Sequence, residues 1–271
     1  MKNIIAYVGC LASLAAFAVE PEAESKVELE EESSGALIAE VGVDFMSTYI
    51  WRGQILADAP VWQPSATLGY DFGDYGALKA NVWSSFKLTS RRDGSPVSGM
   101  GNQEVDYTVS YAKSFDALDL EFGHIWYTFP NSHNEGHTEE LFATAAYNNE
   151  IVTPTLGLYW DYRDNDDRGL FYGNLALAHE FEVVENLTVT PSVSLGLASD
   201  AYTYAMCGER RTAFLDQTVG VSASYAVTES LSLGAQINYT WIVDNDSRGA
   251  GYMGNDKDQR VWGGLSVAYA F

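Results

Sequence analysis

The amino-acid sequence predicts an all-β fold, a transmembrane antiparallel up-and-down β-barrel of about 12 strands. Three observations predict it. Apolar and polar residues alternate with a period of two, the connections alternate between short and long, and aromatic residues gather at both ends of the expected strands. A period of two gives each strand one apolar face and one polar face. That pattern is typical of a barrel wall with an apolar exterior and a polar lumen.

The N-terminus has the features of an export signal. Lys2 supplies a positive charge, residues 4–18 are mostly apolar, and Ala16-Phe17-Ala18 fits a small-residue cleavage site. We therefore predict a signal peptide over residues 1–18. The alternative is a lipidation site at Cys10, although the apolar run continues past that cysteine.

A strongly acidic leader is predicted to follow. Residues 19–35 hold seven glutamates and one lysine, and the whole chain has a formal net charge of -22. Such a stretch cannot bury an apolar core, so we expect it to be disordered on the periplasmic side. The net charge also argues against nucleic acid as a partner, because phosphate binding needs a basic face.

The barrel itself is predicted over residues 36–271. A tilted strand needs roughly 9–11 residues to cross a membrane, and the expected segments reach that length. An even number of strands returns the C-terminus to the side of the N-terminus. The expected strands are 37–51, 61–72, 77–89, 103–115, 117–129, 138–148, 152–163, 169–182, 185–198, 212–227, 230–243 and 259–271.

The last strand carries the clearest alternation. Val261, Leu265, Val267, Tyr269 and Phe271 form one apolar row, and small or polar residues form the other. This strand resembles the closing strand of bacterial outer-membrane β-barrels. In that family a terminal aromatic residue belongs to the signal read by the insertion machinery. The resemblance implies that Phe271 has this role and that outer-membrane lipid and lipopolysaccharide surround the barrel.

Aromatic residues and prolines refine this picture. Two groups of aromatic residues at opposite strand ends predict girdles at the two membrane interfaces; Tyr49 and Trp51 are assigned to the group near the long loops. Pro64 and Pro191 fall inside expected strands. Because proline lacks a ladder donor, we expect a bulge or a missing bond at each.

The inward rows hold most ionisable residues, and carboxylates outnumber basic groups there. Fixed carboxylates in a narrow tube concentrate cations and repel anions, which predicts a mildly cation-preferring pore. The alternative is a barrel filled by its own side chains, with Trp83, Tyr159, Tyr172 and Trp262 pointing inward. The predicted pore-lining residues are Asp44, Arg52, Lys79, Asn81, Lys87, Asp106, Glu121, Asp161, Asp216, Gln236, Asn238 and Arg260.

No catalytic residue, metal site or cofactor is predicted. The repeat of residues 164–172 at 244–252 clusters Asp and Asn oxygens, but each copy has arginine where a calcium loop needs a ligand. An acidic outer loop is the better interpretation. His133 and His137 fall in another expected outer loop without a motif that fixes catalytic geometry.

The first expected strand carries a short motif. Ser47, Tyr49, Ile50, Arg52 and Gly53 match a Ser-x-Tyr-Ile-x-Arg-Gly pattern. It resembles the opening of a porin-like family of Gram-negative outer-membrane β-barrels that has no settled activity, so the resemblance implies fold and location only. We expect Arg52 to lie inward at the long-loop end, beside a lumen carboxylate.

Together these features lead to one expectation and one alternative. We expect a porin-like channel in the outer membrane of a Gram-negative bacterium, with both termini periplasmic, for passive diffusion of small hydrophilic solutes. The alternative is a closed structural or surface-interaction barrel that transports nothing. The polar lumen favours the first, and the inward aromatic rings favour the second.

Overall fold

The computed structural model describes residues 35–88, 101–130, 136–149, 151–163, 169–254 and 256–271. The predicted signal peptide and nearly all of the acidic leader lie outside the described residues.

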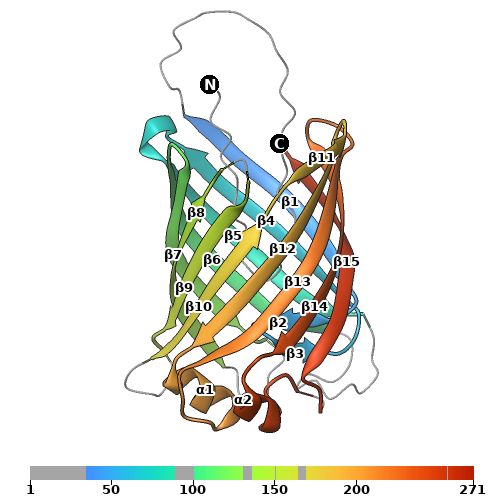
Figure 1. Cartoon of the computed structure of the whole chain (residues 1–271). Helices are drawn as coiled ribbons and strands as arrows, with labels where there is room; N and C mark the ends of the chain where they lie inside the picture. The colour runs from blue at the N-terminus through green and yellow to red at the C-terminus, as the bar shows by residue number, and fades with distance from the viewer. Residues whose placement is uncertain (1–34, 89–100, 131–135, 150, 164–168, 255) are drawn as a thin grey trace, which may run out of the picture.

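One antiparallel sheet forms the wall of the molecule and closes on itself (Figure 1). Each long strand pairs with the strand before and after it, which is the up-and-down order, and the β1–β15 and β10–β12 pairings close the ring. The predicted fold class is confirmed. The strands of the wall are β1 (Ala36–Met46), β4 (Val61–Asp71), β5 (Ala77–Lys87), β6 (Gly101–Phe115), β7 (Leu118–Thr128), β8 (His137–Tyr147), β9 (Thr153–Asp161), β10 (Leu170–Ala178), β11 (Phe181–Val184), β12 (Leu187–Ala198), β13 (Ala213–Ala226), β14 (Leu231–Ile242) and β15 (Gln259–Ala270).

The wall is apolar outside and polar inside. Ile237, Val261 and Leu265 expose 61–63% of their surface, whereas Lys79 and Asp106 are 6% and 2% exposed. A water-soluble barrel would place these two classes the other way round, so the outer face of the wall is suited to contact with lipid. Among the described residues, no helix is both long and apolar enough to cross a membrane.

The two ends of the barrel differ. At the end where β1 begins and β15 finishes, the connections are short turns such as the 3-10 helix η1 (Gly73–Tyr75) (Figure 1). Asp116 and Asn186 adopt positive φ in two of these turns, a conformation that Asp and Asn tolerate. The longer connections lie at the opposite end.

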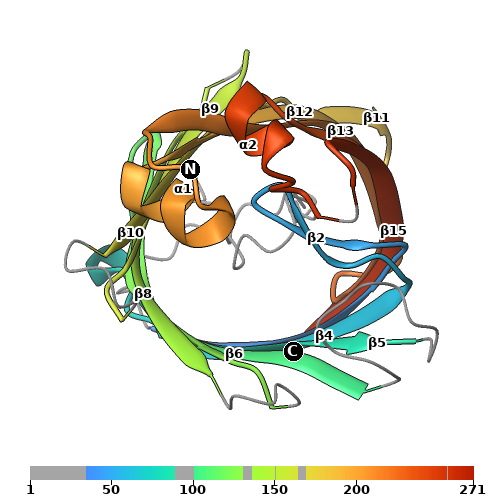
Figure 2. The same ribbon diagram turned by 90° about the horizontal axis from the view of Figure 1, so that it is seen from below.

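The first expected strand, 37–51, was predicted too long. β1 stops at Met46, which pairs directly with Val61 of β4. The residues between them fold into the lumen as a separate two-stranded sheet of β2 (Tyr49–Trp51) and β3 (Gln54–Ala57) (Figure 2). We call residues 47–60 the inward hairpin. Tyr49–Trp51 continues the alternation of β1, so periodicity alone could not reveal the change of direction.

Two other long connections, at 199–211 and 244–258, contain helices where loops were expected. α1 (Asp200–Cys207) begins at Ser199, whose side chain accepts from the Tyr202 N–H, and ends at Gly208 in the left-handed conformation. α2 (Asn245–Gly249) is capped in the same way by Asp244. Both helices lie at the long-loop mouth (Figures 1 and 2).

Pro64 and Pro191 each interrupt one of the two ladders of their strand. The β10–β12 pairing stops at Ala178 and Ser192, and β11 resumes it with Phe181 opposite Val189, so the gap lies at Pro191. This also divides the expected strand 169–182. The β4–β5 pairing likewise skips the positions around Pro64 without a shift in register.

Candidate functional site

The inward hairpin is held from several sides at the long-loop end of the lumen. Its Ser47 N–H donates to the Gly263 carbonyl at 2.9 Å, and its Ile55 N–H donates to the Met253 carbonyl at 2.9 Å. Asp58 pairs with Lys257 at 2.7 Å and also with Arg260. These contacts join the hairpin to β15 and to the segment that precedes it, so the hairpin is part of the barrel's core rather than a free loop.

Arg52 at the tip of the hairpin makes a bidentate ion pair across the lumen. Its Nη1 and Nη2 atoms each lie 2.7 Å from a different oxygen of Glu140 on β8, and Tyr127 of β7 donates to the same carboxylate at 2.9 Å. The two charged side chains are 7% and 3% exposed. Two parallel charge-assisted bonds fix both position and orientation.

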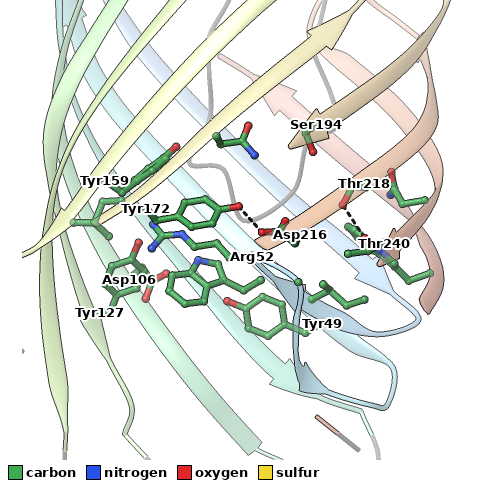
Figure 3. Close-up of a pocket in the computed structure, with 17 residues that line it drawn as sticks. Tyr49, Arg52, Asp106, Tyr127, Tyr159, Tyr172, Ser194, Asp216, Thr218 and Thr240 are labelled. Carbon is green, nitrogen blue, oxygen red and sulfur yellow. Dashed lines mark hydrogen bonds between the residues drawn. The ribbon is translucent and has the colours of Figure 1, made fainter. Parts of the chain in front are cut away.

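Aromatic rings surround the same guanidinium (Figure 3). The Arg52 Cζ atom lies 4.2 Å from the ring centroid of Trp51, 4.7 Å from Tyr159 and 4.6 Å from Tyr172, with Tyr202 of α1 at 5.9 Å. Rings at this distance attract a cation through their π-faces.

Charge and burial determine the protonation states of Arg52 and of the neighbouring Tyr202. Burial by itself lowers the pKa of Arg52, but the Glu140 carboxylate raises it above its ordinary value. Burial raises the pKa of Tyr202 to about 12. At neutral pH the Arg52 guanidinium is therefore charged, and the Tyr202 phenol beside it is neutral.

Close backbone approach makes this packing possible. Gly53 has φ +81°, and a Cβ atom there would lie 2.7 Å from Cβ of Asp216 on β13. Asp216 in turn accepts from the Tyr172 hydroxyl at 2.9 Å. Gly53 thus lets the hairpin tip contact the wall.

A second aromatic cluster lies beside the first. The Tyr49 ring is 5.5 Å from the ring of Trp83, and its hydroxyl donates to Glu104 at 2.9 Å. Trp262 belongs to the same buried cluster and donates to Thr240 at 2.9 Å. Tyr49 and Trp51 therefore face the lumen, and their predicted place in an outer girdle was wrong because the hairpin turns inward.

A cavity of about 90 Å³ remains between the hairpin and the wall (Figure 3). It is lined by hairpin residues, by rings of both aromatic clusters and by the carboxylates Asp106 and Asp216. Asp106 is 2% exposed and its Oδ1 atom has no hydrogen-bond partner. The cavity is thus small, partly aromatic and acidic.

The structure brings only some of the predicted pore-lining residues to this cavity: Arg52, Asp106, Asp216 and Asn238. Lys79 pairs with Glu121 at 3.1 Å nearer the short-turn end, where Asn81 donates to Thr67 at 2.9 Å. The others lie elsewhere on the inner wall: Lys87 and Asp161 are buried, while Asp44, Gln236 and Arg260 are partly buried.

Three residues of this site were absent from the predicted pore-lining residues. Glu140 follows the inward row of its strand, so its alternation could have identified it. Glu104 shares the inward parity of Asp106 and carried the same signal. Tyr202 lies on a helix where a loop was expected, and only the Ser199 and Gly208 caps pointed to that helix.

The other motifs have structural partners. In the second acidic repeat, Asp244 caps α2 and pairs with Arg211 at 2.8 Å, and Asp246 also contacts Arg211; residues 164–168 of the first copy lie outside the described residues. His137 contacts Arg163 at 2.7 Å, and His133 lies outside the described residues. Within the described part of the chain, no group of three or more His, Cys, Asp or Glu residues is placed to hold a metal ion.

Known proteins match this chain by structure. No family model matches it, and no curated protein matches it. An outer membrane channel from Pseudomonas putida has TM-score 0.55 and 14% identity, over 91% of this chain and 100% of that one. The NanC porin has TM-score 0.48 and 13% identity, over 86% and 98% of the two chains. At 14% identity, the similarity to the Pseudomonas putida channel shows a shared fold alone.

Proposed function

We propose that this barrel is a porin-like channel for passive diffusion of small hydrophilic solutes, with a mild preference for cations. The observation that carries the proposal is the inward hairpin. A hairpin anchored to the wall by Asp58, Arg52 and Tyr49 narrows a polar lumen at one height. A fixed constriction of this kind selects solutes by size and charge.

The charge of the constriction supports the cation preference. Arg52 is paired with Glu140 at 2.7 Å, which leaves Asp106 and Asp216 as the other ionisable acids that line the cavity. Carboxylates in a low-dielectric passage attract cations and repel anions over several ångströms. The fold shared with an outer membrane channel is consistent with this function.

The outer membrane of a Gram-negative bacterium is the location we propose, with both termini in the periplasm. β1 and β15 pair at the end with short turns, where the Phe271 N–H donates to the Ala39 carbonyl at 2.9 Å. Short periplasmic turns and long outer loops are usual in this class. We further propose that Phe271 is read by the insertion machinery and that lipid and lipopolysaccharide contact the exterior.

The second candidate is a closed barrel, and one observation favours it. Tyr159 and Tyr172 share one buried cluster with Tyr202, and Trp83 and Trp262 share the other with Tyr49. The inward rings therefore gather around the hairpin, and the cavity they leave is about 90 Å³. In this candidate the outer loops alone carry the function.

Liposome swelling distinguishes the two candidates. The mature protein is refolded into liposomes, and swelling is followed in neutral solutes of increasing size, from glycerol to disaccharides. The channel predicts rapid swelling in the smallest solute that falls steeply with size. No swelling from protein that shows the heat-modifiable mobility of a folded barrel would select the closed barrel.

A further inference from the structure

Asp106 differs from the other buried acids around the constriction. Glu140 is paired with Arg52, Glu104 accepts from Tyr49 and Asp216 accepts from Tyr172. Oδ1 of Asp106 has no such partner, although the residue is 2% exposed and lines the cavity. Buried polar atoms are normally paired, so a cation in the cavity would supply the partner that this oxygen lacks.

Aromatic residues flank this carboxylate on both sides. Trp83 of β5 and Tyr127 of β7 are its direct cross-strand neighbours. Tyr49 stacks near Trp83 with ring centroids 5.5 Å apart, and Trp51 lies 6.1 Å from the Tyr127 ring. Two rings thus flank Asp106 along the sheet, and Tyr49 and Trp51 of the inward hairpin contact those two rings.

Arg52 shows which kind of group this layer of the lumen accommodates. It combines a carboxylate partner at 2.7 Å with three ring centroids within 4.7 Å. A carboxylate together with aromatic faces is the arrangement that holds ammonium and methylated ammonium groups. Asp106 and the rings of Tyr49, Trp51 and Tyr127 bring the same kinds of group to the lining of the cavity.

We propose that the cavity is a binding site for a small organic cation, with a primary or methylated ammonium group held by Asp106 among the rings of Tyr49, Trp51 and Tyr127, which line the cavity. The volume of about 90 Å³ has room for such a group, since a single water needs only about 10–15 Å³ on the same kind of measure. This proposal deepens the proposed channel and rests on it, because the site lies on the path through the constriction.

The test compares choline with its uncharged isostere 3,3-dimethyl-1-butanol. Binding to the refolded protein in detergent is measured by calorimetry and by tryptophan fluorescence. Block of KCl conductance is measured separately in a planar bilayer. We expect choline to bind and block, and the neutral isostere to do neither, because shape is matched and only the charge differs. Equal binding of the two would overturn the proposal without any variant.

Two variants then locate the site. Asp106→Asn keeps the shape and removes the charge, and should weaken choline binding about tenfold or more, since a charge-assisted contact is lost. Asp44→Asn removes one inward carboxylate that does not line the cavity and should leave choline binding unchanged. An equal loss of choline affinity in both variants would contradict a binding site at Asp106.

The conductance assay separates this proposal from the proposed channel. Conductance without choline block and without choline binding would refute the cation site and leave the channel standing. Choline binding with no conductance would refute the channel, and with it the place of the site on a solute path. Heat-modifiable mobility on a gel confirms that each variant is folded.

Discussion

Arg52 and Glu140 lie 88 residues apart in the chain and form a bidentate ion pair inside the barrel, with both N–O distances at 2.7 Å. The pair joins the inward hairpin to β8 on the wall. It holds the hairpin tip against β8, together with the contacts of the hairpin to β15.

Glu140→Gln should destabilise the protein by about 3–5 kcal/mol, because it leaves the buried Arg52 charge without its counter-charge. Urea unfolding of the protein in lipid vesicles measures this cost. Arg52→Gln and the double variant complete a double-mutant cycle. The free energy of unfolding should fall clearly less in the double variant than the sum of its losses in the two single variants. Simple additivity of these losses would show that the two residues do not interact.

Gly53→Ala should displace the hairpin tip and destabilise the protein by roughly 1–3 kcal/mol. The position has φ +81°, and the added Cβ would lie 2.7 Å from Asp216. Gly208→Ala is the matched control, because Gly208 also has φ +81° and nothing lies within 4 Å of a Cβ there. Equal stability of the two variants would argue against close packing at the tip.

Removing the hairpin should widen the channel. Met46 and Val61 are paired neighbours, so an Asn-Gly turn replacing residues 47–60 closes β1 onto β4. Single-channel conductance should rise by roughly twofold or more, because the wall keeps its diameter while the lumen loses its filling. Unchanged conductance in a folded variant would mean that the hairpin does not limit flow.

Leu265→Arg tests the assignment of the outer face. Leu265 is 63% exposed at the middle of β15, and a charge at the bilayer midplane of a barrel costs about 2–4 kcal/mol. Glu229→Arg, in an exposed turn at the strand ends, should cost much less. The free energy of unfolding in lipid vesicles measures both costs. Equal losses of stability in the two variants would contradict a lipid-facing position for Leu265.

The sequence predicted the wall well and the constriction only in part. Alternation locates residues such as Leu265 and Asp106 on opposite faces because the side-chain period of a strand is fixed. The inward position of Arg52 followed from the same reasoning. The pairing of Arg52 with Glu140 and its packing against Tyr172 and Tyr202 did not, because contacts across the lumen depend on register and loop folding, which local patterns do not specify.

The inward hairpin shows this limit most clearly. Tyr49-Ile50-Trp51 continues the pattern of β1, yet the backbone turns away because Met46 already pairs with Val61. Arg52 and Gly53 both adopt positive φ at the tip of the hairpin, but they follow the expected strand 37–51, so they gave no sign that the chain leaves the wall after Met46.

The most direct test of the proposed channel is single-channel recording of the refolded mature protein in a planar bilayer with a KCl gradient across it. We expect discrete conductance steps and a reversal potential on the cation side, because the carboxyl groups of Asp106 and Asp216 line the constriction. Discrete steps with an anion-side reversal potential would contradict the role given to these carboxylates. No steps from folded protein would contradict the channel itself.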